Sequence, residues 1–254
     1  MRTVTYQVEQ KDAWITINRP DKRNAVNYEV MTELMECLGR AESDPNVRAV
    51  IVKGSGDAAF CSGGDLSVFH NLKTEVEAKE MLERMNRVLD KLYFFPKPTV
   101  ALLNGTAIGG GCELATACDY RFSTPQAKIG FVQGGLAITT GWGGGTLLFT
   151  RIDRSKAFSM LTSSAIYSAH AAKEMGFVDH ILAGDALIEH CQQEIEEVLA
   201  SPPDVCKAYK AMALRTVNKE ELRRQMAEEI AECARLWALP AHEKAVQRFI
   251  EKKL

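Results

Sequence analysis

The chain has 254 residues, of which 46% are hydrophobic and 25% are charged, the composition of a soluble globular protein with a full-sized core. Its formal net charge is −2 and no long run carries a single sign, so the sequence gives no reason to expect nucleic acid or a membrane surface as a partner. The seven cysteines, an odd number without metal-site spacing, argue against a disulfide framework and predict buried thiols in a reducing compartment.

No apolar signal region is seen at the N-terminal end, and no segment approaches the length of a membrane span. We therefore expect a cytoplasmic protein.

Strand-like and helix-like segments alternate along the first part of the chain. Strands are predicted at Val4–Gln7, Ala13–Ile17, Arg48–Lys53 and Thr99–Leu103, and helices at Tyr28–Ser43 and Val76–Tyr93. The first helix has apolar residues at spacings of three and four, with Asn27 as its N-cap and Asp44-Pro45 at its end. This alternation predicts right-handed βαβ units and a mostly parallel sheet.

Two glycine-rich turns, at residues 61–65 and 108–113, each follow an apolar strand-like run and precede a predicted helix. The start of a helix leaves backbone N–H groups unpaired and carries partial positive charge. Either turn alone is better explained as a tight connection, and it is their joint occurrence that favours a functional role. If the two turns face one another, they hold one oxygen between two amide donors, which is an oxyanion hole. Glu113 then lies in the first turn of the second helix, within reach of a bound substrate.

The C-terminal part, from about Asp204, is helical and charged, with apolar residues recurring every three or four positions. It has too little apolar surface to form a core of its own. The sequence thus divides into a core domain over residues 1–200 and a helical segment over residues 201–254, which we expect to pack on the core domain or on a neighbouring subunit.

Motifs throughout the chain resemble the crotonase superfamily, the enoyl-CoA hydratase/isomerase family. They lie at residues 15–25, 48–54, 59–65, 97–119 and 169–182. The resemblance implies an α/β fold, a spiral of ββα units forming two nearly perpendicular sheets with outer helices and a helical C-terminal part. It also implies an acyl-CoA substrate with no further cofactor and no metal, since coenzyme A is part of the substrate. The C-terminal segment would then mediate assembly into homotrimers or dimers of trimers.

The resemblance assigns catalytic roles to four residues. The backbone N–H groups of Ser62 and Gly110 match the family's two oxyanion donors, and Glu113 matches the first of its two glutamates. The second glutamate is replaced by Gln133. An amide orients water but does not exchange a proton near neutral pH. The replacement therefore weighs against hydration by two carboxylates.

Acyl-CoA binding is the second role that the resemblance assigns. Lys22 and Arg23 match the turn that contacts the coenzyme A phosphates, although exposed basic residues in a turn are often merely solvated. Asp65 is interpreted as a helix cap in preference to a substrate contact. The full set of implied binding residues is Lys22, Arg23, Ala25, Ser62, Gly63, Gly64, Asp65, Leu66, Gly109, Gly110, Trp142, Phe249 and Lys252.

Three functions remain open. A single carboxylate supports double-bond isomerisation through an enolate. Decarboxylation of a methyl- or ethylmalonyl-CoA type thioester needs no base, and residues 113–121 together with Trp142 resemble ethylmalonyl-CoA decarboxylases. Trp142 is also explained by simple core packing. The third reading is a non-catalytic acyl-CoA-binding subunit, which Gln133 favours and Glu113 disfavours.

Overall fold

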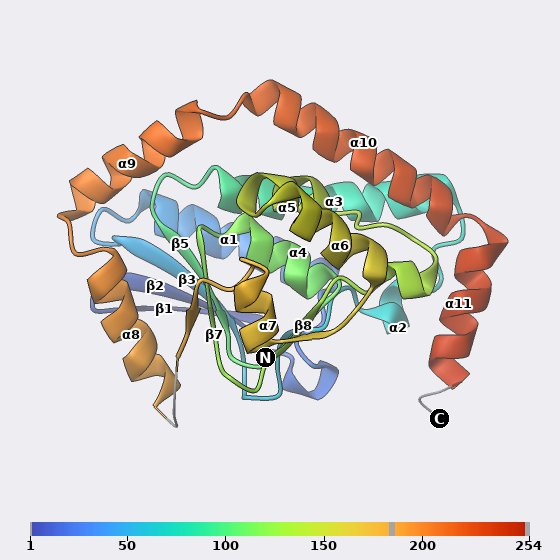
Figure 1. Cartoon of the computed structure of the whole chain (residues 1–254), viewed down its shortest axis with the longest axis horizontal. Coiled ribbons are helices and arrows are strands. Elements are labelled where there is room, and N and C mark those ends of the chain that lie inside the picture. Colours follow the sequence, from blue (N-terminus) through green and yellow to red (C-terminus); the bar gives the residue numbers. More distant parts are fainter. Residues whose placement is uncertain (1, 183–185, 252–254) are drawn as a thin grey trace.

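The computed structural model describes residues 2–182 and 186–251 (Figure 1). Its strands are β1 (Val4–Glu9), β2 (Asp12–Ile17), β3 (Ala49–Gly54), β4 (Ala59–Cys61), β5 (Thr99–Leu103), β6 (Thr106–Ile108), β7 (Tyr120–Ser123), β8 (Lys128–Gly130), β9 (Tyr167–Ser168) and β10 (His180–Ile181). Its α-helices are α1 (Tyr28–Ser43), α2 (Leu66–Phe69), α3 (Glu75–Tyr93), α4 (Gly110–Ala117), α5 (Gly144–Arg151), α6 (Arg154–Ser163), α7 (Ala169–Glu174), α8 (Leu187–Val198), α9 (Pro203–Arg215), α10 (Lys219–Trp237) and α11 (Pro240–Glu251). Two 3₁₀ helices are η1 (Pro20–Lys22) and η2 (Gln133–Leu136).

The strands form two sheets. The larger has the order β1-β2-β3-β5-β7-β10, and every neighbouring pair in it is parallel except β1 and β2. The smaller has the order β4-β6-β8-β9, with β4, β6 and β8 parallel to one another. The predicted parallel sheet is confirmed, and the four predicted strands lie within two residues of β1, β2, β3 and β5.

Helix α1 has the predicted bounds because its local signals are strong. The Asn27 side chain accepts a hydrogen bond from the Val30 N–H at 3.0 Å, which satisfies a donor at the helix start. Val30, Leu34 and Leu38 are all buried on one face of the helix. Helix α3 begins with a capping box between Thr74 and Glu77, one residue before the predicted start.

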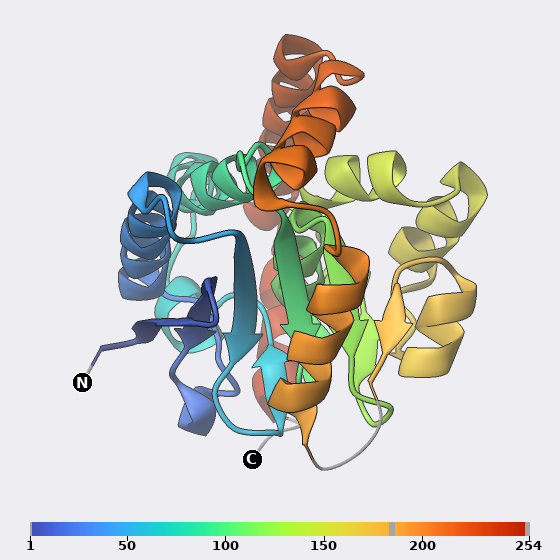
Figure 2. The ribbon, with the colours of Figure 1, turned by 90° about the vertical axis from the view of Figure 1, so that its left-hand side faces the viewer.

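The larger sheet is covered on both faces. Val50 and Val52 of β3 contribute to the main core, which α1, α3 and α4 also line. Ile51, between them, points to the other face, where α8 packs with Cys191 and Ile195 (Figure 2). This burial on both faces is typical of a parallel sheet.

The C-terminal helices arch over the rest of the molecule (Figure 1). Helix α10 lies along α3 and contributes Leu222, Met226, Ile230 and Trp237 to the main core. Each fully buried side chain of this kind stabilises the packing by about 1.5–3 kcal/mol. The expectation that this segment packs on the core domain is therefore confirmed for α10.

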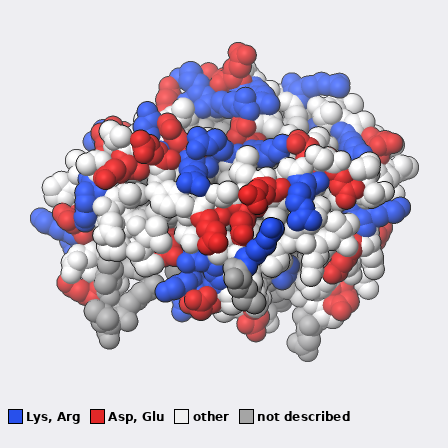
Figure 3. All heavy atoms as spheres, turned by 180° about the vertical axis from the view of Figure 1, so that it is seen from behind, with Lys and Arg blue, Asp and Glu red and all other residues white. Residues whose placement is uncertain are grey.

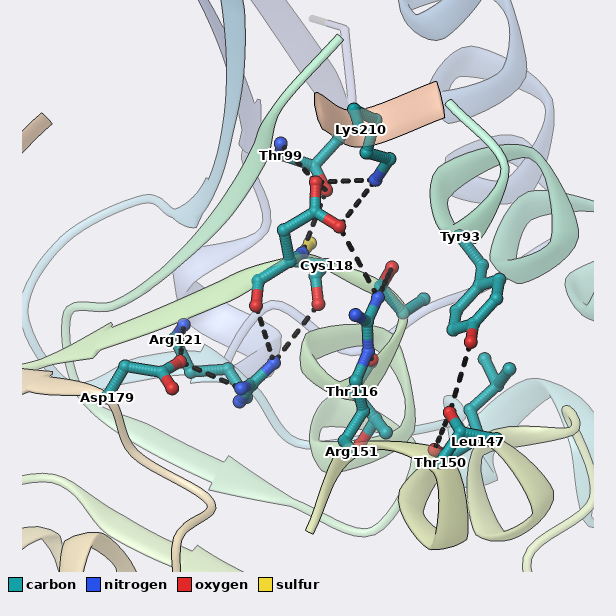
Figure 4. A network of polar contacts seen from close by, with 12 residues as sticks. Tyr93, Thr99, Thr116, Cys118, Arg121, Leu147, Thr150, Arg151, Asp179 and Lys210 are labelled. Carbon is teal, nitrogen blue, oxygen red and sulfur yellow. Dashed lines mark hydrogen bonds and ion pairs between the residues drawn. The ribbon is translucent and has the colours of Figure 1, made fainter. Parts of the chain in front are cut away.

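Helix α9 is joined to the core by a partly buried ion pair (Figure 4). The Lys210 Nζ lies 2.5 Å from both carboxylate oxygens of Asp119, which also accepts hydrogen bonds from Thr99. Arg151, the last residue of α5, lies 3.6 Å from Asp119 and donates to the Thr116 carbonyl near the end of α4. The C-terminal ends of α4 and α5 are thus held together.

The surface mixes charges of both signs on the face seen in Figure 3. Among the residues that the structure describes, no helix has the length and apolarity to cross a bilayer. All seven cysteines are free thiols, and only Cys206 is not fully buried, which confirms the predicted burial of Cys112 and Cys118.

Candidate active site

The first glycine turn leaves β4 and is hydrogen-bonded to the N-terminal part of the chain. The Gly63 carbonyl accepts from the Val26 N–H at 2.8 Å, and the Asp65 N–H donates to the Val26 carbonyl at 2.8 Å. Gly63 has a φ of +91°, which favours glycine. A Cβ at this position would lie 3.1 Å from the Gly110 nitrogen. The first glycine turn therefore contacts the second.

The second glycine turn leaves β6 and begins α4. Gly110 is the first residue of this helix. A Cβ on Gly110 would lie 2.2 Å from Cζ3 of the Trp142 ring, too close for any side chain. Glycine is required here because the indole packs directly on the helix backbone.

Both turns line one cavity of about 320 Å³. Gly63 and Gly64 come from the first turn, and Gly109 and Gly110 from the second. The other lining side chains are mostly apolar and come from α2, α3, the η2 region and the C-terminal helices: Phe69, Met81, Leu82, Leu136, Ile138 and Trp237. The structure thus brings together the two turns that the sequence placed far apart.

The N–H groups of the two turns differ in their partners. The Ser62 N–H donates to the Arg23 carbonyl at 3.1 Å, so it is already used within the protein. This corrects the expectation that Ser62 supplies one of the two donors. Over residues 2–182 and 186–251, the N–H groups of Gly64 and Gly110 have no protein acceptor. For Gly110 the cause is its place at the start of a helix, where no preceding carbonyl is available.

Glu113 is almost completely buried, with 3% of its surface exposed. Its Oε1 accepts hydrogen bonds from the N–H groups of Gly141 at 3.2 Å, Trp142 at 2.8 Å and Gly144 at 3.2 Å. Its Oε2 accepts from Nε2 of Gln133 at 2.9 Å. Glu113 and Gln133, which are predicted to share the site, are therefore in direct contact.

Burial raises the pKa of Glu113 to about 8, and the nearby Glu229 carboxylate acts in the same direction. Hydrogen bonds from the backbone of Trp142 and Gly144 and from Gln133 offset part of this rise. The protonated form of Glu113 therefore predominates at neutral pH. Within the described residues, Oε1 of Gln133 is buried with no hydrogen-bond partner. Since Gln133 lines the cavity, a bound molecule with a donor group would satisfy this oxygen.

Trp142 packs against both glycine turns. Its side chain is 4% exposed and lines the cavity. A Cβ on Gly64 would lie 3.7 Å from Cζ2 of the indole, which also packs on Gly110. The Trp142 carbonyl accepts a hydrogen bond from Nδ2 of Asn86 at 2.9 Å, which fixes the segment on α3. Trp142 is thus both a packed residue and a cavity-lining residue.

The N-terminal turn lies beside the first glycine turn. Lys22 and Arg23 are exposed, Ala25 is buried, and the Arg23 carbonyl is bonded to the Ser62 N–H. In the part of the chain that the structure describes, the residues that line the 320 Å³ cavity include none of these three. Their position at its edge is compatible with contact to a substrate that extends out of the cavity.

Asp65 is the N-cap of α2, as the sequence interpretation favours. Its side chain accepts from the Ser67 N–H at 3.0 Å and forms an ion pair with Arg19 at 2.8 Å. Leu66, the next residue, lines the cavity.

The C-terminal helices complete the cavity. Phe249 of α11 lines it, as do Cys233 and Trp237 of α10. Lys252, the last predicted binding residue, lies outside the described residues. Cys233, Trp237 and the neighbouring Glu229 are not among the residues predicted from the sequence. The apolar spacing of α10 signals a buried face but does not say what that face covers.

Comparisons with known proteins find clear relatives of this chain. A sequence model of the enoyl-CoA hydratase/isomerase family matches residues 8–254. The Bacillus subtilis protein YngF is 38% identical over 193 residues, covering 75% of this chain and 73% of that protein. An ethylmalonyl-CoA decarboxylase from Xenopus tropicalis is 34% identical over 204 residues, covering 80% of this chain and 68% of that protein.

Among solved structures, an enoyl-CoA hydratase from Bacillus halodurans superposes with a TM-score of 0.88 at 23% identity, covering 97% of this chain and 99% of that one. The fold expected from the sequence resemblance is confirmed.

Proposed function

Since this chain belongs to the enoyl-CoA hydratase/isomerase family, we propose that it binds an acyl-CoA thioester and stabilises the enolate of the acyl group. One observation carries the proposal: two glycine turns, each with a backbone N–H unpaired within the described residues, line one apolar cavity beside a buried carboxyl group. We assign the two oxyanion donors to Gly64 and Gly110. A donor of this kind contributes about 100- to 1000-fold to the rate.

Glu113 is the acid/base residue of this proposal. Its raised pKa makes it a proton donor near neutral pH, and the N–H group of Gln133 holds its carboxyl group in place. Gln133 positions the carboxyl group and presents its own oxygen to the bound molecule. No step of this chemistry needs a further cofactor, because coenzyme A arrives with the substrate.

A second candidate is the decarboxylation of a methyl- or ethylmalonyl-CoA type thioester. The specific observation that favours it is a buried carboxyl group hydrogen-bonded to an amide, with its pKa raised by burial. Cleavage of the bond between the α-carbon and the carboxylate releases carbon dioxide and leaves the electron pair as the enolate. Glu113 then gives its proton to the α-carbon and is reprotonated from water. The similarity to an ethylmalonyl-CoA decarboxylase supports the same reaction.

Coenzyme A binding and assembly are the remaining parts of the proposal. We assign Lys22 and Arg23 to the coenzyme A phosphates, with Phe249 and Lys252 contacting the same molecule from the C-terminal end. Helix α9 exposes Tyr209 and Met212, at 64% and 55%, which supports a role in forming trimers or dimers of trimers.

A panel of thioesters tests the proposal. The full-length protein is incubated with enoyl-, 3-hydroxyacyl- and alkylmalonyl-CoA, and the products are followed by mass. Loss of carbon dioxide indicates decarboxylation and gain or loss of water indicates hydratase activity. A shifted double bond at unchanged mass, detected by chromatography, indicates isomerisation. Binding of all of these thioesters without any turnover would instead support the non-catalytic reading.

A further inference from the structure

Glu229 of α10 is a half-buried acid that the proposed chemistry does not use. Its Oε1 accepts hydrogen bonds from the N–H groups of Gly143 at 3.1 Å and Gly145 at 3.2 Å, and its Oε2 accepts from Thr146 at 2.6 Å. Both oxygens accept hydrogen bonds from backbone N–H groups at the start of α5. The acid thus fixes the beginning of α5.

Glu113 binds the other N–H groups of the same loop. Residues 141, 142 and 144 donate to Glu113, whereas residues 143, 145 and 146 donate to Glu229. The loop comes so close to Glu113 that a Cβ on Gly144 would lie 2.3 Å from the Glu113 Cβ. The two acids, from helices far apart in the sequence, therefore share one short backbone segment.

Glu229 also supplies the negative charge that acts on Glu113. The titratable neighbours of Glu113 are Glu229 and Cys233 on α10 and Cys112 on α4. Burial raises the pKa of both thiols, so they remain uncharged. In the described part of the chain, no basic side chain pairs with either acid. Glu229 is therefore the charged group that bears on the Glu113 proton.

We propose that Glu229 is a positioning residue for Glu113: it fixes the 141–146 loop that binds the Glu113 carboxyl group, and it places a second carboxyl group against the same loop. The geometry supports both parts through the alternating hydrogen bonds of the loop. The consequence for turnover rests on the proposed function, whereas the effect on the ionisation of Glu113 does not.

The test is a pH titration of Glu113 by ¹³C NMR in the full-length protein labelled at the glutamate side-chain carboxyl carbons. The Glu113 signal is assigned by its loss in Glu113→Gln. Glu229→Gln removes the charge but keeps an acceptor oxygen, and we expect the Glu113 midpoint to fall by about one pH unit, a tenfold change in the ionisation constant. Glu228→Gln is the matched control, because Glu228 is adjacent on α10, exposed, and paired with Arg224.

An unchanged Glu113 midpoint in Glu229→Gln, or an equal fall in Glu228→Gln, overturns the proposal. If Glu229→Gln does not fold, Glu229→Asp replaces it. The shorter side chain keeps the charge but no longer reaches the loop as well, so hydrogen exchange at the N–H groups of Gly145 and Thr146 should become faster. Unchanged exchange at both groups overturns the proposal.

Failure of this inference is distinguishable from failure of the proposed function, because the titration uses no substrate. A lowered Glu113 midpoint in Glu229→Gln, with no turnover of any thioester by the wild type, contradicts only the proposed function. Turnover by the wild type with an unchanged Glu113 midpoint in the variant contradicts only the role of Glu229. Where decarboxylation is found, its rate in Glu229→Gln should begin to fall about one pH unit earlier as the pH rises.

Discussion

Replacing Glu113 with glutamine should change how the stability of the protein depends on pH. In the unfolded chain this carboxyl group ionises near its ordinary pKa of 4.5, whereas in the folded protein burial raises the pKa to about 8. Its contribution to stability is therefore fully present below about pH 4.5 and is lost as the pH rises to about 8. The loss amounts to at most 1.36 kcal/mol per pH unit, or roughly 5 kcal/mol as an upper limit over the interval.

The measurement is urea unfolding of the wild-type protein and Glu113→Gln at one fixed protein concentration, from about pH 5 to about pH 9. Glutamine has a similar shape and does not titrate. The free energy of unfolding of the wild type, minus that of the variant, should fall steadily up to about pH 8 and then level off. Glu228→Gln, exposed on α10, should show no such trend. Parallel pH profiles for the wild type and Glu113→Gln would refute the reasoning.

Three further predictions concern turnover and backbone fit. Glu113→Gln should lower turnover of the thioester found by the panel by about 100- to 10,000-fold with an unchanged circular dichroism spectrum, and full activity would exclude Glu113 from the mechanism. Gln133→Glu should raise crotonyl-CoA hydration at least about tenfold by restoring a second carboxylate, measured from the loss of the enoyl absorbance; no gain would mean that the cavity is unsuited in other ways. Gly63→Ala should cost about 1–2 kcal/mol in urea unfolding, because its φ is +91° and the new methyl would press on the Gly110 N–H. Gly39→Ala, in an open position of α1, is the control and should be neutral or stabilising.

The sequence predicts those features whose causes are local. Asn27 fixes the start of α1 through a side chain three residues from its partner, and the apolar spacing fixes the buried face. The pairing of Glu113 with Gln133 also agrees with the structure, because the family resemblance carries the long-range information that spacing lacks.

The remaining features depend on contacts between distant segments. The Arg23 carbonyl pairs with the Ser62 N–H, and the Gly64 N–H is left unpaired within the described residues. No pattern within the turn itself predicts this distant partner. The place of Glu229 follows from how α10 lies along α3, which an amphipathic pattern alone leaves open. Side-chain chemistry was therefore easier to predict than the direction of backbone groups.

Helices α4 and α5 lie side by side and are joined at their far ends through Arg151, and α4 begins at the cavity. The N–H group at this end of α4 belongs to the Gly110 peptide and is unpaired within the described residues, so no side-chain replacement removes it while the glycine remains. What the protein does with a stabilised enolate depends instead on the side chains at positions 113 and 133. Substitutions at these two positions can therefore change the reaction, while the backbone groups that stabilise the enolate stay the same.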